Sequence, residues 1–255
     1  MGKRTMTPRP WAVLFWLVVW QGAAMAMDAA FPHGDLLLPS PLSALARLGA
    51  LAATGAFWRA VGWSAGRILG GFLAACLLAV ALAVLAFRCR WVRELLAPLV
   101  AAVKAVPVVS FIILALVWVN SRSLSVLISG LMVFPAVYGN VLTGIGQADR
   151  QLLEMARVFR VPVLRQLRGI YLPAVLPYFR SALSLGMGLC WKSGAAAEVI
   201  GLPDGSIGDH LYSAKVYFQT ADLFAWTAVI IAASVLLERL LLRGVDALTG
   251  KVGKL

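Results

Sequence analysis

Side chains capable of covalent or metal chemistry are few in this sequence and poorly grouped. They are Cys76, Cys89, Cys190, His33 and His210. No two cysteines form a CxxC pair, and the two histidines lie far apart in the chain. This spacing predicts neither a disulfide framework nor a metal cluster. We therefore expect no metal and no cofactor.

A nucleotide-binding motif is also absent. The segment TGK at 249–251 lacks the rest of a phosphate-binding loop, because Val245 stands where the first glycine is needed and Val252 where Ser or Thr is needed. We expect no nucleophile elbow, and no HExxH zinc motif occurs. The sequence thus predicts a protein that is not an enzyme and does not hydrolyse ATP by itself.

Polar side chains inside apolar stretches form a second candidate group, because such residues are functional candidates in membrane proteins. We expect a polar pathway through the apolar stretches to use Ser129, Tyr138, Asn140, Lys192 and Glu198. Lys192 lies roughly 25 Å along a helix counted from residue 175, so it can instead reach the outer surface. Glu198 is expected at that surface, as an external gate or docking residue.

The composition defines the elements that must position these residues. Of 255 residues, 61% are hydrophobic and 13% charged, and the mean hydropathy is +0.87; soluble domains are about 45–50% apolar and about 25% charged. Long apolar runs cover residues 11–27, 65–87, 95–119, 124–146, 175–199 and 223–242. Lipid requires backbone groups to pair internally, so we predict an all-α polytopic membrane protein with about six transmembrane helices. Helix kinks are expected at Pro98, Pro107 and Pro135.

Basic residues alternate between the connections. One side carries Lys3, Arg4, Arg9, Arg88, Arg90, Arg93, Arg150, Arg157, Arg160, Arg165, Arg168, Arg239, Arg243, Lys251 and Lys254. The other carries fewer basic residues and several acidic ones: Arg47, Arg59, Arg67, Arg122, Lys215, Asp28, Asp35, Asp204, Asp209 and Asp222. The positive-inside rule places the first set and both termini in the cytoplasm. Topology thus accounts for much of the net charge of +12, and no nucleic-acid partner is expected.

The N-terminus allows two interpretations. Its basic residues, short apolar run and AMA at 24–26 also fit a secretory signal with its cleavage site. The orientation of the later helices is the same in either case.

A basic segment with helical periodicity interrupts the apolar runs near the middle of the chain. In LLEMARVFRVPVLRQLRGIYLPAVLP, residues 152–177, apolar positions recur at helical spacing before and after Pro162. Proline suits the first turn of a helix, so we predict two short amphipathic helices with a turn near Arg160–Val161. Such a loop can lie on a protein partner. It can also contact anionic lipid, where each basic residue contributes about 1 kcal/mol of favourable binding free energy.

The spacing within this segment resembles the EAA loop of binding-protein-dependent ABC importer permeases, E-A-A-x3-G-x9-I-x-L-P. The matching positions are Glu154, Ala156, Ile170, Leu172 and Pro173. Met155 replaces the second residue of the motif, and Arg160 replaces the glycine. Since a non-glycine residue with positive φ costs roughly 1–2 kcal/mol, either Arg160 accepts that cost or the turn stays right-handed.

Further stretches resemble the sulfonate, nitrate and taurine branch of these permeases. They are LPSPLSAL at 38–45, LLAPLVAAVKAVPVVSF at 95–111, KSGAAAEVIG at 192–201 and SIGDHLYSAKVYFQTADLFAW at 206–226. The resemblance implies a MetI-like type I importer permease core in the bacterial cytoplasmic (inner) membrane. It also implies a second permease copy as a homodimer, cytoplasmic ABC ATPase subunits, an external solute-binding protein, and a sulfonate-, nitrate- or taurine-like or other small organic solute.

The resemblance further implies that the EAA loop docks on the ATPase. The coupling residues would be Leu152, Glu154, Ala156, Arg157, Phe159, Arg160, Arg165, Ile170, Leu172 and Pro173. We expect Ala156 to share an apolar face with Leu152 and Phe159, and that face to enter a groove on the partner. A stand-alone secondary transporter and a membrane scaffold are the alternatives.

The chain divides by this interpretation into three parts. Residues 1–64 would hold the N-terminal span and an external segment, residues 65–245 the transmembrane permease domain, and residues 246–255 a cytoplasmic tail. The EAA loop would occupy about 147–174 within the permease domain.

Overall fold

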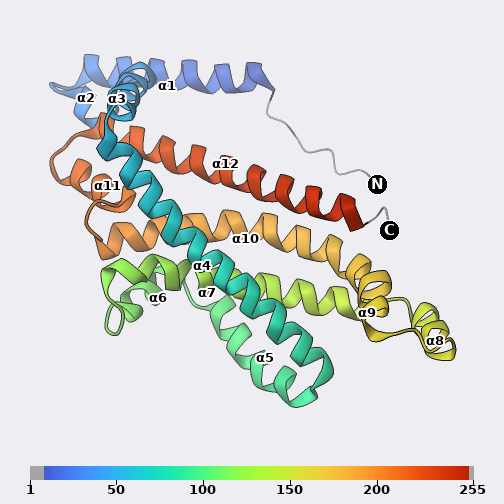
Figure 1. Cartoon of the computed structure of the whole chain (residues 1–255). Helices are drawn as coiled ribbons and strands as arrows, with labels where there is room; N and C mark the ends of the chain where they lie inside the picture. The colour runs from blue at the N-terminus through green and yellow to red at the C-terminus, as the bar shows by residue number, and fades with distance from the viewer. Residues whose placement is uncertain (1–8, 253–255) are drawn as a thin grey trace.

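A computed structural model describes residues 9–252, with side chains described as far as Ala247, and every regular element in that part is helical (Figure 1). The helices are α1 (Pro10–Ala30), α2 (Gly34–Leu37), α3 (Pro41–Ala52), α4 (Gly55–Arg88), α5 (Arg90–Ala105), α6 (Val108–Ala115), α7 (Ser121–Gly146), α8 (Arg150–Val158), α9 (Val163–Gln166), the π-helical turn η1 (Leu167–Tyr171), α10 (Leu172–Gly201), α11 (Ile207–Val216) and α12 (Thr220–Val252). The predicted all-α class is confirmed.

The predicted apolar runs fall on α1, α4, the α5–α6 pair, α7, α10 and α12. Within the described residues, α1, α4, α7 and residues 220–247 of α12 are long and apolar enough to cross a membrane, and the α5–α6 pair is a further candidate. The 30-residue α10 is not among these candidates; polar and small residues interrupt its apolar sequence.

The run at 95–119 is two helices that bend by 106° at Val106 and Pro107. Val106 is extended (φ −80°, ψ 133°), the conformation that a following proline favours, and Pro107 has no N–H to continue the helix. By contrast, Pro98 and Pro135 lie inside α5 and α7 without ending them.

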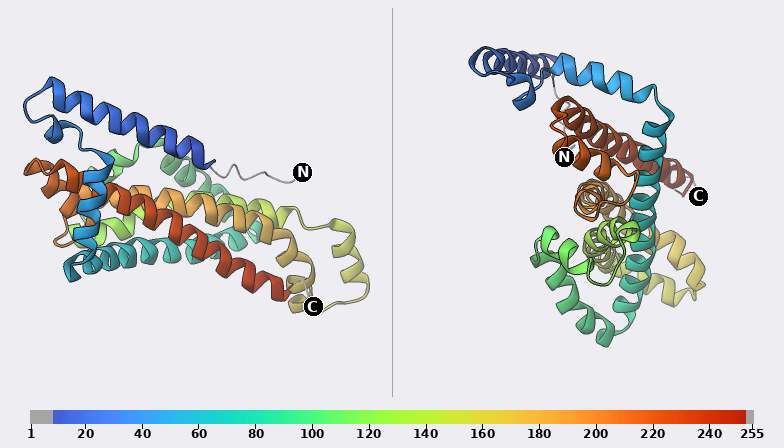
Figure 2. Two further views of the ribbon diagram at one scale, coloured as in Figure 1. Left: turned by 90° about the horizontal axis from the view of Figure 1, so that it is seen from above. Right: turned by 90° about the vertical axis from the view of Figure 1, so that its left-hand side faces the viewer.

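Helix α7 lies at the centre and packs mainly against α4 on one side and α10 on the other (Figure 2). Small residues allow this approach, because a Cβ at Gly71 would lie 2.2 Å from the carbonyl oxygen of Val126 and one at Gly144 would lie 2.9 Å from the Cα of Val175. Lipid tails are as apolar as the side chains, so the hydrophobic effect does not drive helices together within a membrane. Close packing at small residues contributes to their association instead.

Side-chain caps fix where the helices begin. The side chains of Ser40, Thr54, Asn120 and Ser206 accept hydrogen bonds from the backbone N–H three residues later, at 3.0 to 3.3 Å. These bonds satisfy amides that have no partner within a helix.

The N-terminal segment packs loosely on this bundle. Trp20 donates a hydrogen bond to the carbonyl of Pro39 (3.1 Å) and its ring lies 5.3 Å from that of Phe224, whereas most apolar side chains of α1 are exposed, as expected for a lipid-facing helix. Arg47 of α3 pairs with Asp222 of α12, and this hydrogen bond and charge raise the pKa of the guanidinium.

The α8–α9 loop, the α4–α5 turn, the start of α1 and the end of α12 lie at one end of the bundle; α3, α6 and α11 lie at the other (Figure 1). This is the grouping of basic segments that the sequence predicts; Lys3, Arg4 and Lys254 lie outside the described residues. Which end faces the cytoplasm stays a prediction, as do the domain divisions, although α4 runs unbroken across residue 64.

The contact of α4 with α7 can be tested with two adjacent glycines. Gly71→Ala should destabilise the chain by about 1–3 kcal/mol, because its methyl group has no space against Val126. Gly70→Ala is the matched control. Nothing lies within 4 Å of its Cβ position, so the variant should be at least as stable as the parent. The measurement is the thermal unfolding midpoint in detergent, and equal midpoints for the two variants would contradict this packing.

Candidate functional site

The basic loop has the two short helices that the sequence predicts. Helix α8 begins after Asp149, whose carboxylate accepts a hydrogen bond from the N–H of Gln151 (2.8 Å). Helix α9 begins after Pro162, and the chain between them turns at residues 159–162. The prediction of two helices with a turn near Arg160–Val161 is confirmed.

The turn itself is left-handed at Arg160, with φ 47°. The N–H of Val161 bonds the carbonyl of Ala156 (2.8 Å), and that of Arg160 bonds the carbonyl of Arg157 (3.1 Å). This pair of bonds is the Schellman C-cap, whose left-handed position glycine normally fills. Arg160 therefore accepts a backbone cost of roughly 1–2 kcal/mol, the first of the two alternatives stated above.

Ala156 does not share the exposed face that the sequence predicts for it. Its side chain is 1% exposed, because the returning chain caps its turn of α8. Leu152, Val158 and Phe159 are exposed instead, the last two at 78% and 74%. The expectation that Ala156 enters a partner's groove is therefore wrong for this conformation of the chain. The exposed apolar surface of the loop is formed by Leu152, Val158 and Phe159 instead.

The charged residues of the loop project into solvent. Glu154, Arg157 and Arg165 are exposed, and none of the three forms an ion pair within the described part of the chain. The outer surface of the loop thus combines exposed apolar side chains with charges available to a partner.

The inner part of the loop joins the bundle through the π-helical turn η1. Gln166 donates a hydrogen bond from Nε2 to the carbonyl of Val161 (2.8 Å), which ties the turn at Arg160 to η1. Ile170 is half-buried, and Leu172 and Pro173 form the first turn of α10. Since α10 packs along α7, the loop is linked to the centre of the bundle at both of its ends.

Of the predicted pathway residues, Ser129 and Tyr138 are enclosed within the helix packing. Ser129 donates to the carbonyl of Ser125 in its own helix (2.6 Å), and the ring of Tyr138 stacks on that of Phe134 at 5.8 Å. In this conformation neither side chain reaches an open surface.

Glu198 is 1% exposed, so its expected position at the outer surface is wrong. Its Oε2 accepts a hydrogen bond from Ser64 (2.6 Å), and Ser64 accepts one from the N–H of Ile207 (3.0 Å). Arg67 lies 3.6 Å from Oε1, too far for a hydrogen bond. The carboxylate thus joins α4, α10 and the start of α11.

Ser64 also lies within GWSAG at 62–66, which has the GxSxG spacing. The string is in the middle of α4 rather than at a strand-to-helix turn, so it is not a nucleophile elbow.

Asn140 lines a groove of about 580 Å³ between α5, α6, α7 and α10. Lys104 also lines it, and it has no ion pair among the described residues. Lys104 was not among the predicted pathway residues, although a lysine within the apolar run at 95–119 is itself a signal of a functional site. Lys192 is exposed and lies outside this groove. The structure therefore brings one predicted pathway residue, Asn140, together with one that was not predicted.

Residues 68–249 match the family described as binding-protein-dependent transport system inner membrane component. The riboflavin transport system permease protein RibX of Chloroflexus aurantiacus is 28% identical over 243 residues, 92% of this chain and 88% of that protein. The putative aliphatic sulfonates transport permease protein SsuC of Bacillus subtilis is 29% identical, covering 81% of this chain and 78% of its own. The taurine transport system permease protein TauC of Escherichia coli is 27% identical, covering 80% and 76%.

The strained turn predicts the effect of restoring the glycine. Arg160→Gly should stabilise the loop by about 1 kcal/mol, because glycine adopts positive φ without a Cβ clash. Hydrogen exchange of the Val161 amide, which caps α8, should slow roughly fivefold. Arg157→Gly is the control. Position 157 lies in the helical last turn of α8, where glycine is destabilising, so exchange of the Val161 amide should become faster. Faster exchange in Arg160→Gly would contradict the assigned turn.

Proposed function

The chain belongs to the family of inner membrane components of binding-protein-dependent transport systems, and on this premise we propose that it forms the solute pathway of an importer that a separate ATPase drives. It is an ABC importer permease of the bacterial inner membrane. The observation that carries the proposal is the exposed apolar and basic loop between α7 and α10, the two helices that pack most closely.

The loop would dock on the ATPase. Exposed Leu152, Val158 and Phe159 supply apolar contacts, and the exposed arginines Arg157 and Arg165 supply charges at the rim. Small interfaces depend on a few such anchors. Glu154 and Arg160 would lie at the edge of this surface, while Ala156, Ile170, Leu172 and Pro173 would set the shape of the loop and its connection to α10. Both chain termini would share this cytoplasmic side.

The groove at Lys104 and Asn140 would line the solute pathway. It is open on one side in the single chain, so a second copy would close it in a homodimer. The amine of Lys104 and the amide oxygen of Asn140 have no protein partner among the described residues, since the amide nitrogen alone is bonded, to Ala136 (2.8 Å). Both can therefore bind a polar solute group, while Ser129, Tyr138 and Glu198 would support the helices and Lys192 would lie outside the pathway.

An external solute-binding protein would deliver the solute. The named relatives carry out riboflavin, sulfonate and taurine transport, so a small organic solute is the proposed cargo. The chain would bind no nucleotide and catalyse no reaction of its own, and neither a cofactor nor nucleic acid has a role.

Reconstitution into vesicles distinguishes this function from a stand-alone secondary transporter. Uptake of taurine, an aliphatic sulfonate or riboflavin should require ATP, the ATPase subunit and the binding protein together. Uptake by the chain alone, driven by an ion gradient, would overturn the proposal.

Docking through the exposed face predicts a specific loss. Phe159→Asp places a carboxylate in the contact, and an unpaired buried charge costs several kcal/mol. Co-purification of the ATPase and solute uptake should both fall at least about tenfold, with normal membrane insertion. Gln151→Asp, which adds the same charge outside the apolar surface, is the control and should keep both. Equal behaviour of the two variants would exclude docking through this face; Ala156→Asp is less informative because it would disrupt the loop itself.

The pathway proposal predicts that Lys104 and Lys192 differ. Lys104→Met should lower uptake about tenfold, because losing one charge-assisted hydrogen bond to the solute weakens binding by about that factor. The ATPase should remain bound. Lys192→Met removes the same charge from an exposed site and should transport normally. Uptake rates at saturating binding protein provide the measurement, and a larger defect in Lys192→Met would place the pathway elsewhere.

A further inference from the structure

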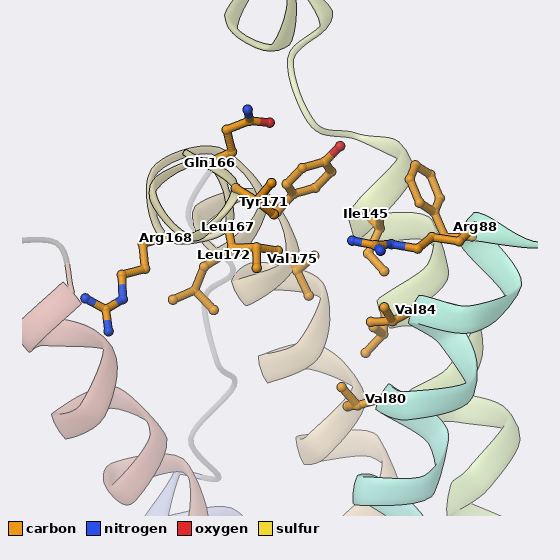
Figure 3. Close-up of a pocket in the computed structure, with 13 residues that line it drawn as sticks. Val80, Val84, Arg88, Ile145, Gln166, Leu167, Arg168, Tyr171, Leu172 and Val175 are labelled. Carbon is orange, nitrogen blue, oxygen red and sulfur yellow. The ribbon is translucent and has the colours of Figure 1, made fainter. Parts of the chain in front are cut away.

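A second cavity, of about 560 Å³, lies between the ends of α4 and α7 and the turn where η1 leads into α10 (Figure 3). Its volume is within the ~300–1,000 Å³ of small-molecule sites. Its apolar walls come from all three stretches and include Val80, Val84, Val141, Ile145, Leu167 and Val175. The cavity is separate from the groove at Lys104.

The cavity changes from apolar to cationic along its length. Val80, Val84 and Arg88 follow one another at intervals of four residues on α4, so Arg88 lies about 12 Å beyond Val80. In Figure 3 the side chain of Arg88 extends across the mouth toward Ile145, whereas that of Arg168, also part of the lining, extends away from Arg88 on the other side of η1. Of the described residues, none that lines the cavity carries a carboxylate.

The two arginines have no protein partner among residues 9–247, whose side chains the structure describes. Neither Arg88 nor Arg168 forms an ion pair or a side-chain hydrogen bond with another described residue, whereas nearby Arg90 pairs with Glu94 at 2.6 Å. Arg88 and Arg168 are both exposed, so each guanidinium is open to an anion that no described residue supplies. An anion attached to an apolar body would match both this charge and the apolar walls.

The position of the cavity identifies the kind of anion. Helix α4 ends at Arg88, α7 ends at Gly146 and α10 begins at Leu172, so the walls lie where the apolar runs give way to basic loops. By the positive-inside rule this is the level of the cytoplasmic head groups. Basic pockets between helices at that level recognise anionic lipid head groups.

We propose that this cavity binds one anionic phospholipid of the cytoplasmic leaflet. An acyl chain lies between the valine walls, and the phosphate pairs with Arg88. Free phosphate would leave the walls empty, and a zwitterionic lipid would bring its own cation to Arg88. The site is a property of this chain alone, so it stands independently of ATPase docking.

The bound lipid would contact the coupling loop. Leu167 and Tyr171 belong to η1, and the ring of Tyr171 lies 6.5 Å from that of Phe87 across the cavity. Gln166, beside them, bonds the turn at Val161. A lipid in the cavity therefore supports the segment that joins the exposed loop to α10.

Native mass spectrometry of the full chain, released from micelles containing dioleoyl phosphatidylglycerol or dioleoyl phosphatidylcholine, tests the proposal. One phosphatidylglycerol should remain bound to each chain, about tenfold more tightly than phosphatidylcholine. Arg88→Gln should abolish this preference. Arg90→Gln, which removes the same charge at the same membrane level, should retain it.

The apolar part of the site is tested by filling it. Val84→Trp should reduce retention of phosphatidylglycerol at least about tenfold, whereas Leu85→Trp, next to it on α4 but outside the cavity lining, should not. Thermal unfolding midpoints equal to the parent's establish that each variant is folded; Val84→Phe replaces Val84→Trp if that variant unfolds.

Three results would overturn the proposal. Equal loss of preference in Arg88→Gln and Arg90→Gln would mean diffuse surface attraction. Full displacement of the lipid by glycerol 3-phosphate at equal concentration would mean a free-phosphate site. Unchanged retention in the folded Val84 variant would mean that the lipid binds elsewhere, for example at the contact between two copies.

Discussion

The close approach of α7 to α4 and α10 is the contact on which the rest of the structure depends. In a membrane, an apolar side chain gains little free energy by exchanging lipid contacts for contacts with another helix. Helices therefore associate through close packing and polar contacts. Gly71 against Val126, and Gly144 against Val175, leave no space for a methyl group. Because interiors this tightly packed do not deform smoothly, α7 cannot shift without its neighbours. The loop of α8, α9 and η1 is the covalent link between α7 and α10, so a force on it reaches the centre of the bundle directly.

The opposite end of the bundle is held by polar contacts instead. Glu198, Ser64 and the N–H of Ile207 form a buried chain of hydrogen bonds across α4, α10 and α11. A buried carboxylate is costly unless it is bonded, so these three helices are fixed relative to one another. The two ends are therefore stabilised differently, by hydrogen bonds at one and by the loop and its adjoining cavity at the other.

The proposals assign different partners to the two faces of one loop. Its outward face presents Val158 and Phe159, which only a macromolecule can cover efficiently, whereas its inward face encloses an apolar cavity with Arg88 at the mouth. The Schellman turn at Arg160 separates these faces, and the hydrogen bond from Gln166 to the carbonyl of Val161 fixes their relative position. In this arrangement the lipid and the ATPase would act on the same short segment without competing for it.

The sequence by itself determined the helical membrane class and the two-helix loop with its turn, because each follows from local composition or periodicity. It predicted kinks at Pro98, Pro107 and Pro135 alike, whereas among these three only Pro107 lies at a break between helices. It could not decide which apolar positions face a neighbour. Ala156 and Glu198 were both expected to be accessible, and both are buried, because the returning turn covers one and α4 and α11 enclose the other. The groove at Lys104 and the cavity at Arg88 are formed by helices distant in the sequence. Periodicity identifies a face of a helix, but only the packing of distant segments determines what that face meets.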